Sequence, residues 1–322
     1  MSHPSKALPH RVSRQSPDQE ASAAALKAGL VPGLDRQIEK LAASPLSPGL
    51  YLVSTPIGNL ADISLRALFT LSAADLAFCE DTRHSRKLLS AYGISRKLET
   101  YHDFSTERDR GKILDALRAE KSVALISDAG TPLVSDPGFK LVRAAIECGF
   151  EVFAVPGASA LLAGLVVAGL PTDEFHFGGF LPAKPGARQT ALEAVCSVPG
   201  TLIFYESGGR LADALRVIAA ILPGRMVAIA RELTKLHETV LRGTAAELQE
   251  LIQRDPPQGE FVVLIGPGEK SAASAEDIER ALSAAMRNAT LKEAVEEVTK
   301  GLGVGKKVVY NLALKMREGD KR

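Results

Sequence analysis

The residues best suited to bind a ligand lie between Val123 and Gly138, where an apolar run ends in a turn-forming segment. The run is followed by two aspartates, two glycines and two prolines in the sequence DAGTPLVSDPG. Glycine lets a backbone approach a ligand closely, and proline holds a loop in shape. A rigid strand-to-helix turn without a ligand is the alternative. Two carboxylates at the end of a strand favour a binding site.

Three further segments repeat this design at residues 50–60, 76–85 and 151–160. The first is a strand with a Pro/Gly/Asn turn, the second ends in the charged cluster EDTRHS, and the third has Pro-Gly before an Ala/Leu/Gly-rich helix. Helical stretches separate these strands, and Phe139–Cys148 is one of them. The pattern therefore predicts an α/β fold with a mainly parallel sheet and one functional edge.

Seven motifs, in this order along the chain, carry a family resemblance: STPIGNL, EDTRHS, SDAGTPLVSDPG, VPGASA, FGGFLPAK, TLIFYES and ARELTK. They span residues 49–268, and the chain resembles the ribosomal RNA small-subunit (16S) cytidine-2′-O-methyltransferases. These belong to the tetrapyrrole-methylase-like, class III S-adenosylmethionine enzymes. The resemblance implies two α/β domains with a cleft for the methyl donor between them, S-adenosylmethionine as that donor, small-subunit ribosomal RNA as substrate and a homodimer.

The donor contacts are expected at the ends of neighbouring strands. The predicted residues are Pro56, Gly58, Asp128, Gly130, Thr131, Pro156, Gly157, Ser159 and Ala160.

Methyl transfer to a ribose hydroxyl benefits from a base late in the reaction. Glu80, Asp81 and Glu206 are the candidates because each follows or ends a predicted strand. The alternative for each is a salt bridge or a helix N-cap.

Contacts to RNA phosphates are expected from basic residues at the same rim and in the tail. The predicted residues are Arg83, His84, Lys184, Arg188, Lys235, Lys306 and Lys307. Arg86 and Lys87 are interpreted as an ordinary solvated helix face, and Phe180 or Tyr205 could stack on a flipped base.

We predict a disordered extension over 1–48, an N-terminal α/β domain over 49–170, a C-terminal α/β domain with a mixed sheet over 171–270 and a helical tail over 271–322. A short helix is expected over Leu34–Ala43. The second domain should contain strands and helices at these positions: strands Glu174–Leu181, Thr201–Glu206, Met226–Glu232, His237–Arg242 and Phe261–Ile265, and helices Ala187–Cys196, Leu211–Leu222 and Thr244–Arg254.

The tail should form three helices, Ala275–Arg287, Leu291–Lys300 and Lys306–Lys315. The tail resembles a helix-turn-helix module of the family. A helical bundle that serves only dimerisation is the alternative.

Composition and residue spacing limit the kinds of site and the cellular location that this protein can have. The 322 residues carry a net charge of +1, so an RNA site must be a local patch rather than a global basic field. Three widely spaced cysteines are typical of free thiols in a reducing cytoplasm. No apolar run suggests a secretory signal or a membrane span. The histidines and cysteines lack metal-ligand spacing, so no metal is expected.

Two other functions fit the same motifs less well. One is a tetrapyrrole methylase of the same fold, which would carry a more Gly-rich first loop and no helical tail. The other is a non-catalytic ribosome- or RNA-binding protein that has kept the fold.

Overall fold

The computed structural model describes residues 32–102, 104–254, 257–268, 275–287, 289–302 and 304–319. Two compact units divide the chain between Ser159 and Ala160. The predicted domain boundary, after residue 170, falls beyond helix α7 (Ala160–Ala168), whose buried Leu165 and Ala168 belong to the second unit. Of the predicted extension, residues 1–31 lie outside the described residues, and α2 (Pro32–Ala42) coincides with the expected short helix.

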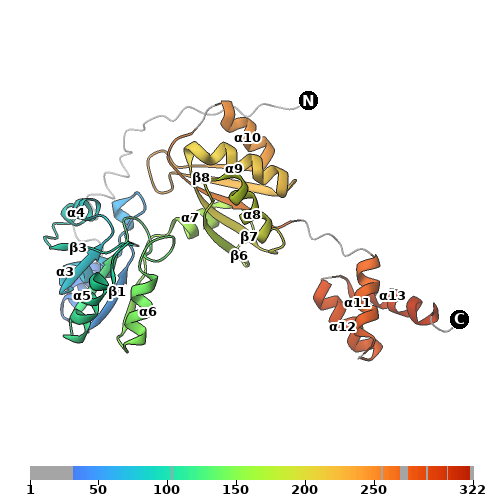
Figure 1. Ribbon diagram of the computed structural model, residues 1–322, viewed down its shortest axis with the longest axis horizontal. Coiled ribbons are helices and arrows are strands. Elements are labelled where there is room, and N and C mark those ends of the chain that lie inside the picture. The colour runs from blue at the N-terminus through green and yellow to red at the C-terminus, as the bar shows by residue number, and fades with distance from the viewer. Residues whose placement is uncertain are drawn as a thin grey trace. The chain divides into compact units, whose positions relative to one another are not determined.

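The first unit is a five-stranded parallel sheet with strand order β3-β2-β4-β1-β5 (Figure 1). Its strands are β1 (Gly49–Val53), β2 (Leu76–Cys79), β3 (Leu98–Thr100), β4 (Ser122–Ile126) and β5 (Val152–Val155). Its other elements are η1 (Leu60–Asp62), α3 (Leu65–Ala73), α4 (Thr82–Ala91), α5 (Glu107–Arg118) and α6 (Phe139–Glu147). The predicted parallel sheet is confirmed.

Helices cover both faces of this sheet because successive residues of each strand point to opposite sides. Tyr51 and Val53 of β1 belong to the apolar core that includes Leu71 of α3. Leu50 belongs to the opposite core, with Ile113 of α5. With both faces covered, the carboxyl ends of the strands are the natural place for ligands.

The second unit contains a mixed sheet with strand order β6-β7-β10-β8-β9. Its strands are β6 (Phe175–Phe180), β7 (Thr201–Ser207), β8 (Met226–Arg231), β9 (Thr239–Thr244) and β10 (Glu260–Ile265). Strands β6 and β7 are parallel, whereas β10 is antiparallel to both β7 and β8, and β8 and β9 form an antiparallel pair, so the predicted mixed sheet is confirmed. Helices α8 (Pro185–Val195), α9 (Gly208–Ile221) and α10 (Ala245–Arg254) share one core with this sheet.

Helix α7 packs on the opposite face of the mixed sheet. A Cβ atom added to Gly164 would lie 3.0 Å from Cγ1 of Val262 in β10, so the missing side chain allows the helix to approach the sheet closely. This helix is apolar on all sides, and the structure leaves Leu162 and Val166 exposed. Among the residues that the structure describes, α8, α9 and α10 therefore cover one face of the mixed sheet and α7 packs on the other.

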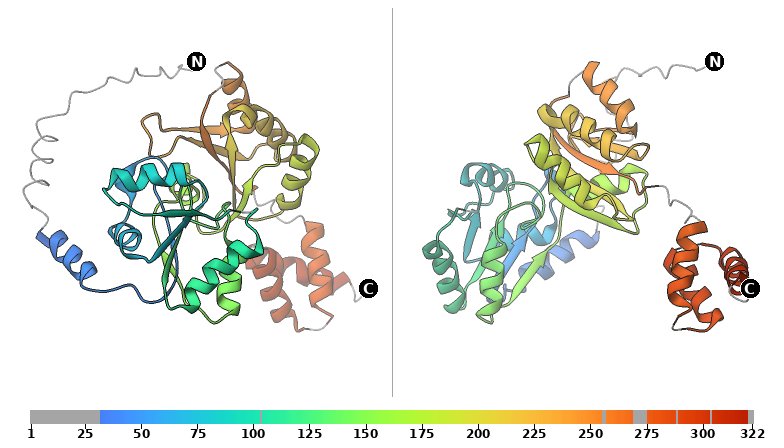
Figure 2. Two further views of the ribbon diagram at one scale, coloured as in Figure 1. Left: turned by 60° about the vertical axis from the view of Figure 1, so that its left-hand side comes forward. Right: turned by 45° about the vertical axis from the view of Figure 1, so that its right-hand side comes forward.

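The tail helices are α11 (Ala275–Ala285), α12 (Leu291–Leu302) and α13 (Lys306–Gly319), as predicted. Ile278, Val295 and Val309 contribute to an apolar core of their own. Figure 2 shows them as an orange-red bundle. A capping box starts α12, since Oε2 of Glu293 accepts hydrogen bonds from both the N–H and the hydroxyl of Thr290.

Within the described ranges, no helix is long and apolar enough to span a membrane.

Candidate active site

The loops that follow β1, β4 and β5 are joined at one edge of the first sheet. Thr55 and Gly130 exchange two backbone hydrogen bonds, of 2.8 and 3.1 Å. A chain of side-chain hydrogen bonds continues across the edge. The hydroxyl of Ser54 donates to Oγ1 of Thr131 (3.1 Å), and the Thr131 hydroxyl donates to the carbonyl oxygen of Ala158 (3.2 Å). Three loops from distant parts of the sequence therefore form one rim.

Two glycines in this rim allow backbone conformations and close contacts that a side chain would disturb. Gly130 has a φ of +82°, a left-handed conformation that side chains disfavour. A Cβ atom on Gly157 would lie 2.9 Å from the Cβ of Ser54, which is closer than non-bonded carbon atoms approach each other. Leu133 and Ser135 adopt left-handed φ values of 72° and 63° in the same β4–α6 loop. Strained backbone of this kind is typical of functional loops.

The structure brings most of the predicted donor residues together. Pro56 and Gly58 lie in the loop after β1, Asp128, Gly130 and Thr131 after β4, and Pro156, Gly157 and Ser159 after β5. These three strands are neighbours in the sheet. Ala160 begins α7 in the second unit. Sequence reasoning missed Ser54, Thr55 and Ser127, although hydroxyl residues at strand ends are a usable signal.

These groups fit a sulfonium donor with an adenosine and an amino-acid part. Asp128 offers a half-buried carboxylate, the loop backbones offer N–H and C=O groups, and the glycines let the loops pack closely at this edge. No cluster of three or more His, Cys, Asp or Glu residues that could hold a metal ion occurs in the part of the chain that the structure covers. The expected absence of a metal stays a prediction.

Asp81 caps helix α4. Its Oδ1 accepts a hydrogen bond of 2.8 Å from the N–H of Arg83, and its Oδ2 lies 2.9 Å from Nη2 of the same residue. The Arg83 side chain and N–H lower the pKa of the Asp81 carboxyl to about 2. A general base works best with a pKa near the operating pH. The alternative interpretation, an N-cap with a salt bridge, therefore describes Asp81 better than catalysis does.

Glu206 is enclosed and paired. Its side chain has no exposed surface, and Oε1 lies 2.6 Å from Nη2 of Arg210. The same oxygen accepts a hydrogen bond of 2.8 Å from the N–H of Ser207. A carboxylate in this position cannot reach a substrate hydroxyl, which argues against the predicted catalytic role. Glu80 is exposed directly after β2 and keeps access to solvent.

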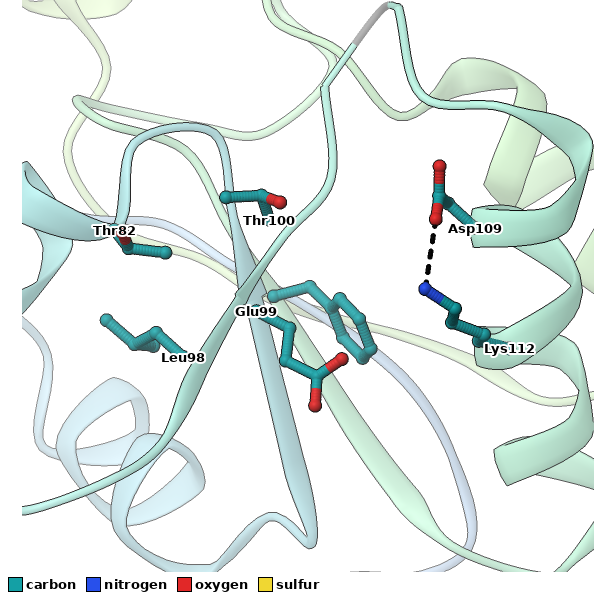
Figure 3. Close-up of a pocket in the computed structure, with 7 residues that line it drawn as sticks. Thr82, Leu98, Glu99, Thr100, Asp109 and Lys112 are labelled. Atoms are coloured by element: carbon teal, nitrogen blue, oxygen red, sulfur yellow. Dashed lines mark hydrogen bonds and ion pairs between the residues drawn. The ribbon is translucent and has the colours of Figure 1, made fainter.

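A pocket of about 290 Å³ opens at the carboxyl ends of β2 and β3, on the same edge of the sheet as the joined loops (Figure 3). Buried Phe78 contributes an apolar wall, and Glu99 and Thr100 of β3 contribute polar groups. An ion pair of 3.1 Å between Asp109 and Lys112 of α5 lines the pocket. Hydrogen bonds from Thr106 and Lys112 lower the pKa of Asp109 to about 2. The pocket therefore presents fixed charges beside an apolar surface.

An aromatic cluster lies on the second sheet. The Tyr205 ring meets Phe177 and Phe180 edge-on, with centroid distances of 4.9 and 5.4 Å, and its hydroxyl accepts a hydrogen bond from the N–H of Leu161. Phe180 is 56% exposed. The cluster leaves one aromatic ring available to stack on a base.

The predicted RNA-contact residues have different environments. Arg83, His84, Lys184 and Lys307 are exposed. Lys306 pairs with Glu296 at 2.9 Å while staying largely exposed. Lys235 is held by Glu260 and Glu232. Burial lowers the pKa of the Lys235 ammonium, but the hydrogen bond and charge of Glu260, with those of Glu232, outweigh burial and raise this pKa above its ordinary value.

Arg188 is the one predicted contact that the structure encloses. It is 1% exposed, and its guanidinium donates to the carbonyl oxygens of Pro182 and Ala183. These bonds fix the loop between β6 and α8. Because the side chain is buried, the structure argues against the predicted phosphate contact for Arg188.

The two-sheet α/β fold, with a loop site at the ends of its parallel strands, is shared with a known class of proteins. Residues 49–249 match the family model for Tetrapyrrole (Corrin/Porphyrin) Methylases, and residues 272–317 match that for the RsmI C-terminal HTH domain. The solved structure of diphthine synthase shares the fold, with a TM-score of 0.53 and 15% identity over 67% of this chain and 89% of that chain.

Curated relatives narrow the class further. The chain is 49% identical to "Ribosomal RNA small subunit methyltransferase I" of Mesorhizobium japonicum, over 87% of this chain and 96% of that protein. It is 48% identical to the protein of the same name from Erythrobacter litoralis, over 85% of this chain and 98% of that protein. The chain therefore belongs to the ribosomal RNA small subunit methyltransferase I family. The predicted family, fold class, enzyme class and S-adenosylmethionine donor are confirmed.

Proposed function

We propose that this chain transfers the methyl group of S-adenosylmethionine to the 2′-oxygen of a cytidine in small-subunit ribosomal RNA. The observation that supports this best is the joined rim of loops after β1, β4 and β5, in a chain that is 49% identical to a ribosomal RNA small subunit methyltransferase. The tetrapyrrole methylases share the fold at low identity, which carries no substrate assignment.

When bound, S-adenosylmethionine supplies a methyl group on a positively charged sulfur. The rim residues then act mainly by positioning. Gly130 and Gly157 let the loops adopt their conformation and pack closely, Thr131 holds two loops together, and Asp128 offers negative charge to a cationic ligand. Alignment of the reacting groups contributes up to about 7–11 kcal/mol to catalysis in favourable cases. No metal is needed for this role.

The acceptor hydroxyl is weakly acidic, so its proton leaves late in the transfer. Glu80 is the proposed acceptor of this proton, because Asp81 is committed to the cap of α4 and Glu206 is enclosed. The exposed cations Arg83, His84 and Lys184 are proposed to hold RNA phosphates. Phe180 is proposed to stack on a base of the substrate.

The tail is proposed to bind the ribosomal subunit, and the second unit is proposed to form a dimer. Lys306 and Lys307 open α13 with exposed charge, which suits contact with an RNA backbone. We propose a homodimer that buries exposed apolar side chains of the second unit, such as Val166 of α7 and Phe175 of β6. We also propose that the enzyme works in the cytoplasm, where the free thiols of its three cysteines stay reduced.

The deciding experiment maps ribose methylation in small-subunit ribosomal RNA from a strain that lacks this chain. We expect one cytidine to lose its 2′-O-methyl group and to regain it when the wild-type chain is restored. A Gly130→Val chain should not restore it. An unchanged methylation map in the deletion strain would refute the proposed function.

A further inference from the structure

The junction between β7 and α9 fixes an arginine that the sequence reasoning did not select. Arg210 lies in the first turn of α9. Its Nη2 is 2.6 Å from Oε1 of Glu206, and its Nε donates to Oγ of Ser207 at 3.2 Å. The N–H of Ser207 also donates to Oε1 of Glu206. The guanidinium is therefore held at two of its three nitrogens, Nη2 and Nε.

The two partners differ sharply in exposure. The side chain of Glu206 is 0% exposed, whereas that of Arg210 is 33% exposed. Oε2 of Glu206 is buried, and within the described ranges it has no hydrogen-bond partner. Burying a carboxylate is costly, and apolar residues often stabilise a fold as well as a buried ion pair does. The ion pair is therefore better explained as a means of orienting the partly exposed Arg210 than as a contribution to the stability of the fold.

The surroundings of Arg210 suit a phosphate. Because β6 and β7 are parallel and β10 is antiparallel to both β7 and β8, the carboxyl ends of β6, β7 and β8 share one edge of the sheet. Lys184 follows β6 and Lys235 follows β8 at this edge. Lys235 is engaged by two carboxylates, while Arg210 is engaged by one. A planar, oriented guanidinium matches phosphate geometry better than a lysine does.

We propose that Arg210 contacts a phosphate of the substrate RNA and that Glu206 is the positioning residue that orients Arg210. This inference rests on the proposed function, because an RNA substrate supplies the phosphate. It replaces the catalytic role predicted for Glu206.

The test compares Arg210→Ala with Arg216→Ala in the full chain. Arg216 lies on the same helix, is 64% exposed and also pairs with one carboxylate, that of Asp213, which makes it a matched control. Binding of small-subunit RNA is measured across salt concentrations, together with kcat and KM for the RNA. We expect Arg210→Ala to raise KM about tenfold, as the loss of a charged hydrogen bond would. The slope of log affinity against log salt should fall by about 0.7–0.9. Arg216→Ala should leave KM and slope unchanged, and neither variant should alter donor affinity measured by calorimetry.

Further variants test whether Glu206 orients Arg210 or only stabilises the fold. Arg210→Lys keeps the charge and should restore the salt slope but not the full affinity. Glu206→Gln should raise KM severalfold without shifting the pH dependence of kcat, and it should add nothing in the Arg210→Ala background. If Arg210→Ala fails to fold, Arg210→Gln takes its place.

A wild-type salt slope and KM in the folded Arg210 variants would overturn the inference. A wild-type chain that neither binds nor methylates RNA would refute the proposed function instead, so the two failures are distinguishable.

Discussion

The backbone N–H of Asp81 donates a hydrogen bond of 3.1 Å to Oδ1 of Asp128. Since β2 and β4 are neighbours, this bond joins the end of β2 to the loop that follows β4. One oxygen of Asp128 therefore fixes the segment that carries Glu80, and we propose that the charge of Asp128 also binds the donor. The position of the proposed base depends in this way on the donor loop.

Asp128→Asn and Asp128→Ala separate these two tasks. Asparagine keeps an oxygen that accepts from Asp81, so we expect Asp128→Asn to weaken binding of cationic S-adenosylmethionine about tenfold, with little effect on the uncharged product S-adenosylhomocysteine. Asp128→Ala should weaken both and also lower kcat. Calorimetry with the two ligands checks this. Equal losses for both ligands in Asp128→Asn would show that the charge of Asp128 does not contact the donor.

Gly130→Val should abolish donor binding without unfolding the chain. The new side chain would crowd Cγ2 of Ile57, which lies 3.3 Å from an added Cβ, and would strain a φ of +82°. Gly149→Val is the control, because Gly149 has a similar φ of +79° with no atom within 4 Å of an added Cβ. Calorimetric titration with S-adenosylmethionine should give no measurable binding for Gly130→Val and wild-type affinity for Gly149→Val. Wild-type affinity in both would place the donor elsewhere.

The charge of Asp81 should stabilise the protein fully above about pH 4, and this stabilisation should be lost as the pH falls towards 2. The pKa of Asp81 falls from an ordinary 3.8 to about 2 because of Arg83. A lowered pKa contributes stability above the ordinary value, and this contribution is lost as the pH falls through the folded value. Asp81→Asn keeps a cap but removes the charge. Urea unfolding at pH 2–6 should show a difference between wild type and variant that shrinks towards pH 2. A difference constant over this range would contradict the assignment.

Arg188→Met should lower stability rather than RNA affinity. The side chain is buried and donates to two carbonyl oxygens, and hydrogen bonds to charged groups contribute about 1.5–3 kcal/mol. Lys184→Met, at an exposed residue of the same loop, should do the reverse: little loss of stability and a shallower salt dependence of RNA binding. Denaturant titration and RNA binding on both variants provide the comparison. A shallower salt dependence in Arg188→Met would restore its predicted RNA contact.

Deletion of residues 271–322 should leave a folded core that binds the donor. The core of the second sheet ends with Ile265, and the tail has its own apolar cluster around Leu282 and Val295. Methylation of ribosomal subunits should fall sharply, because Lys306 and Lys307 are lost. Light scattering and RNA binding on the truncated chain distinguish the alternatives. A monomer with intact RNA affinity would show that the tail only dimerises.

Element types were predictable because they depend on local sequence. Pro56, Gly130 and Gly157 follow β-rich runs, and a strand that ends in such residues is recognisable without a partner. The tail helices follow from the spacing of apolar residues such as Ile278 and Leu282, which lie on one helix face. The loop site was predictable for the same reason, since parallel strands bring their carboxyl ends to one edge.

Tertiary structure alone decided which side chains are accessible to a ligand and which are buried. Ser54 meets Thr131 across 77 positions of sequence, a contact that exists only once β1 and β4 are adjacent. Glu206 and Arg188 have residue types that favour solvent, yet both are buried because their strand or helix turns them towards the core. Arg210, which pairs with the buried Glu206, stays 33% exposed, and this difference also appears only in the folded chain. Sequence determined where the strands end and which residue types gather there, whereas burial and partners depend on contacts between segments far apart in the chain.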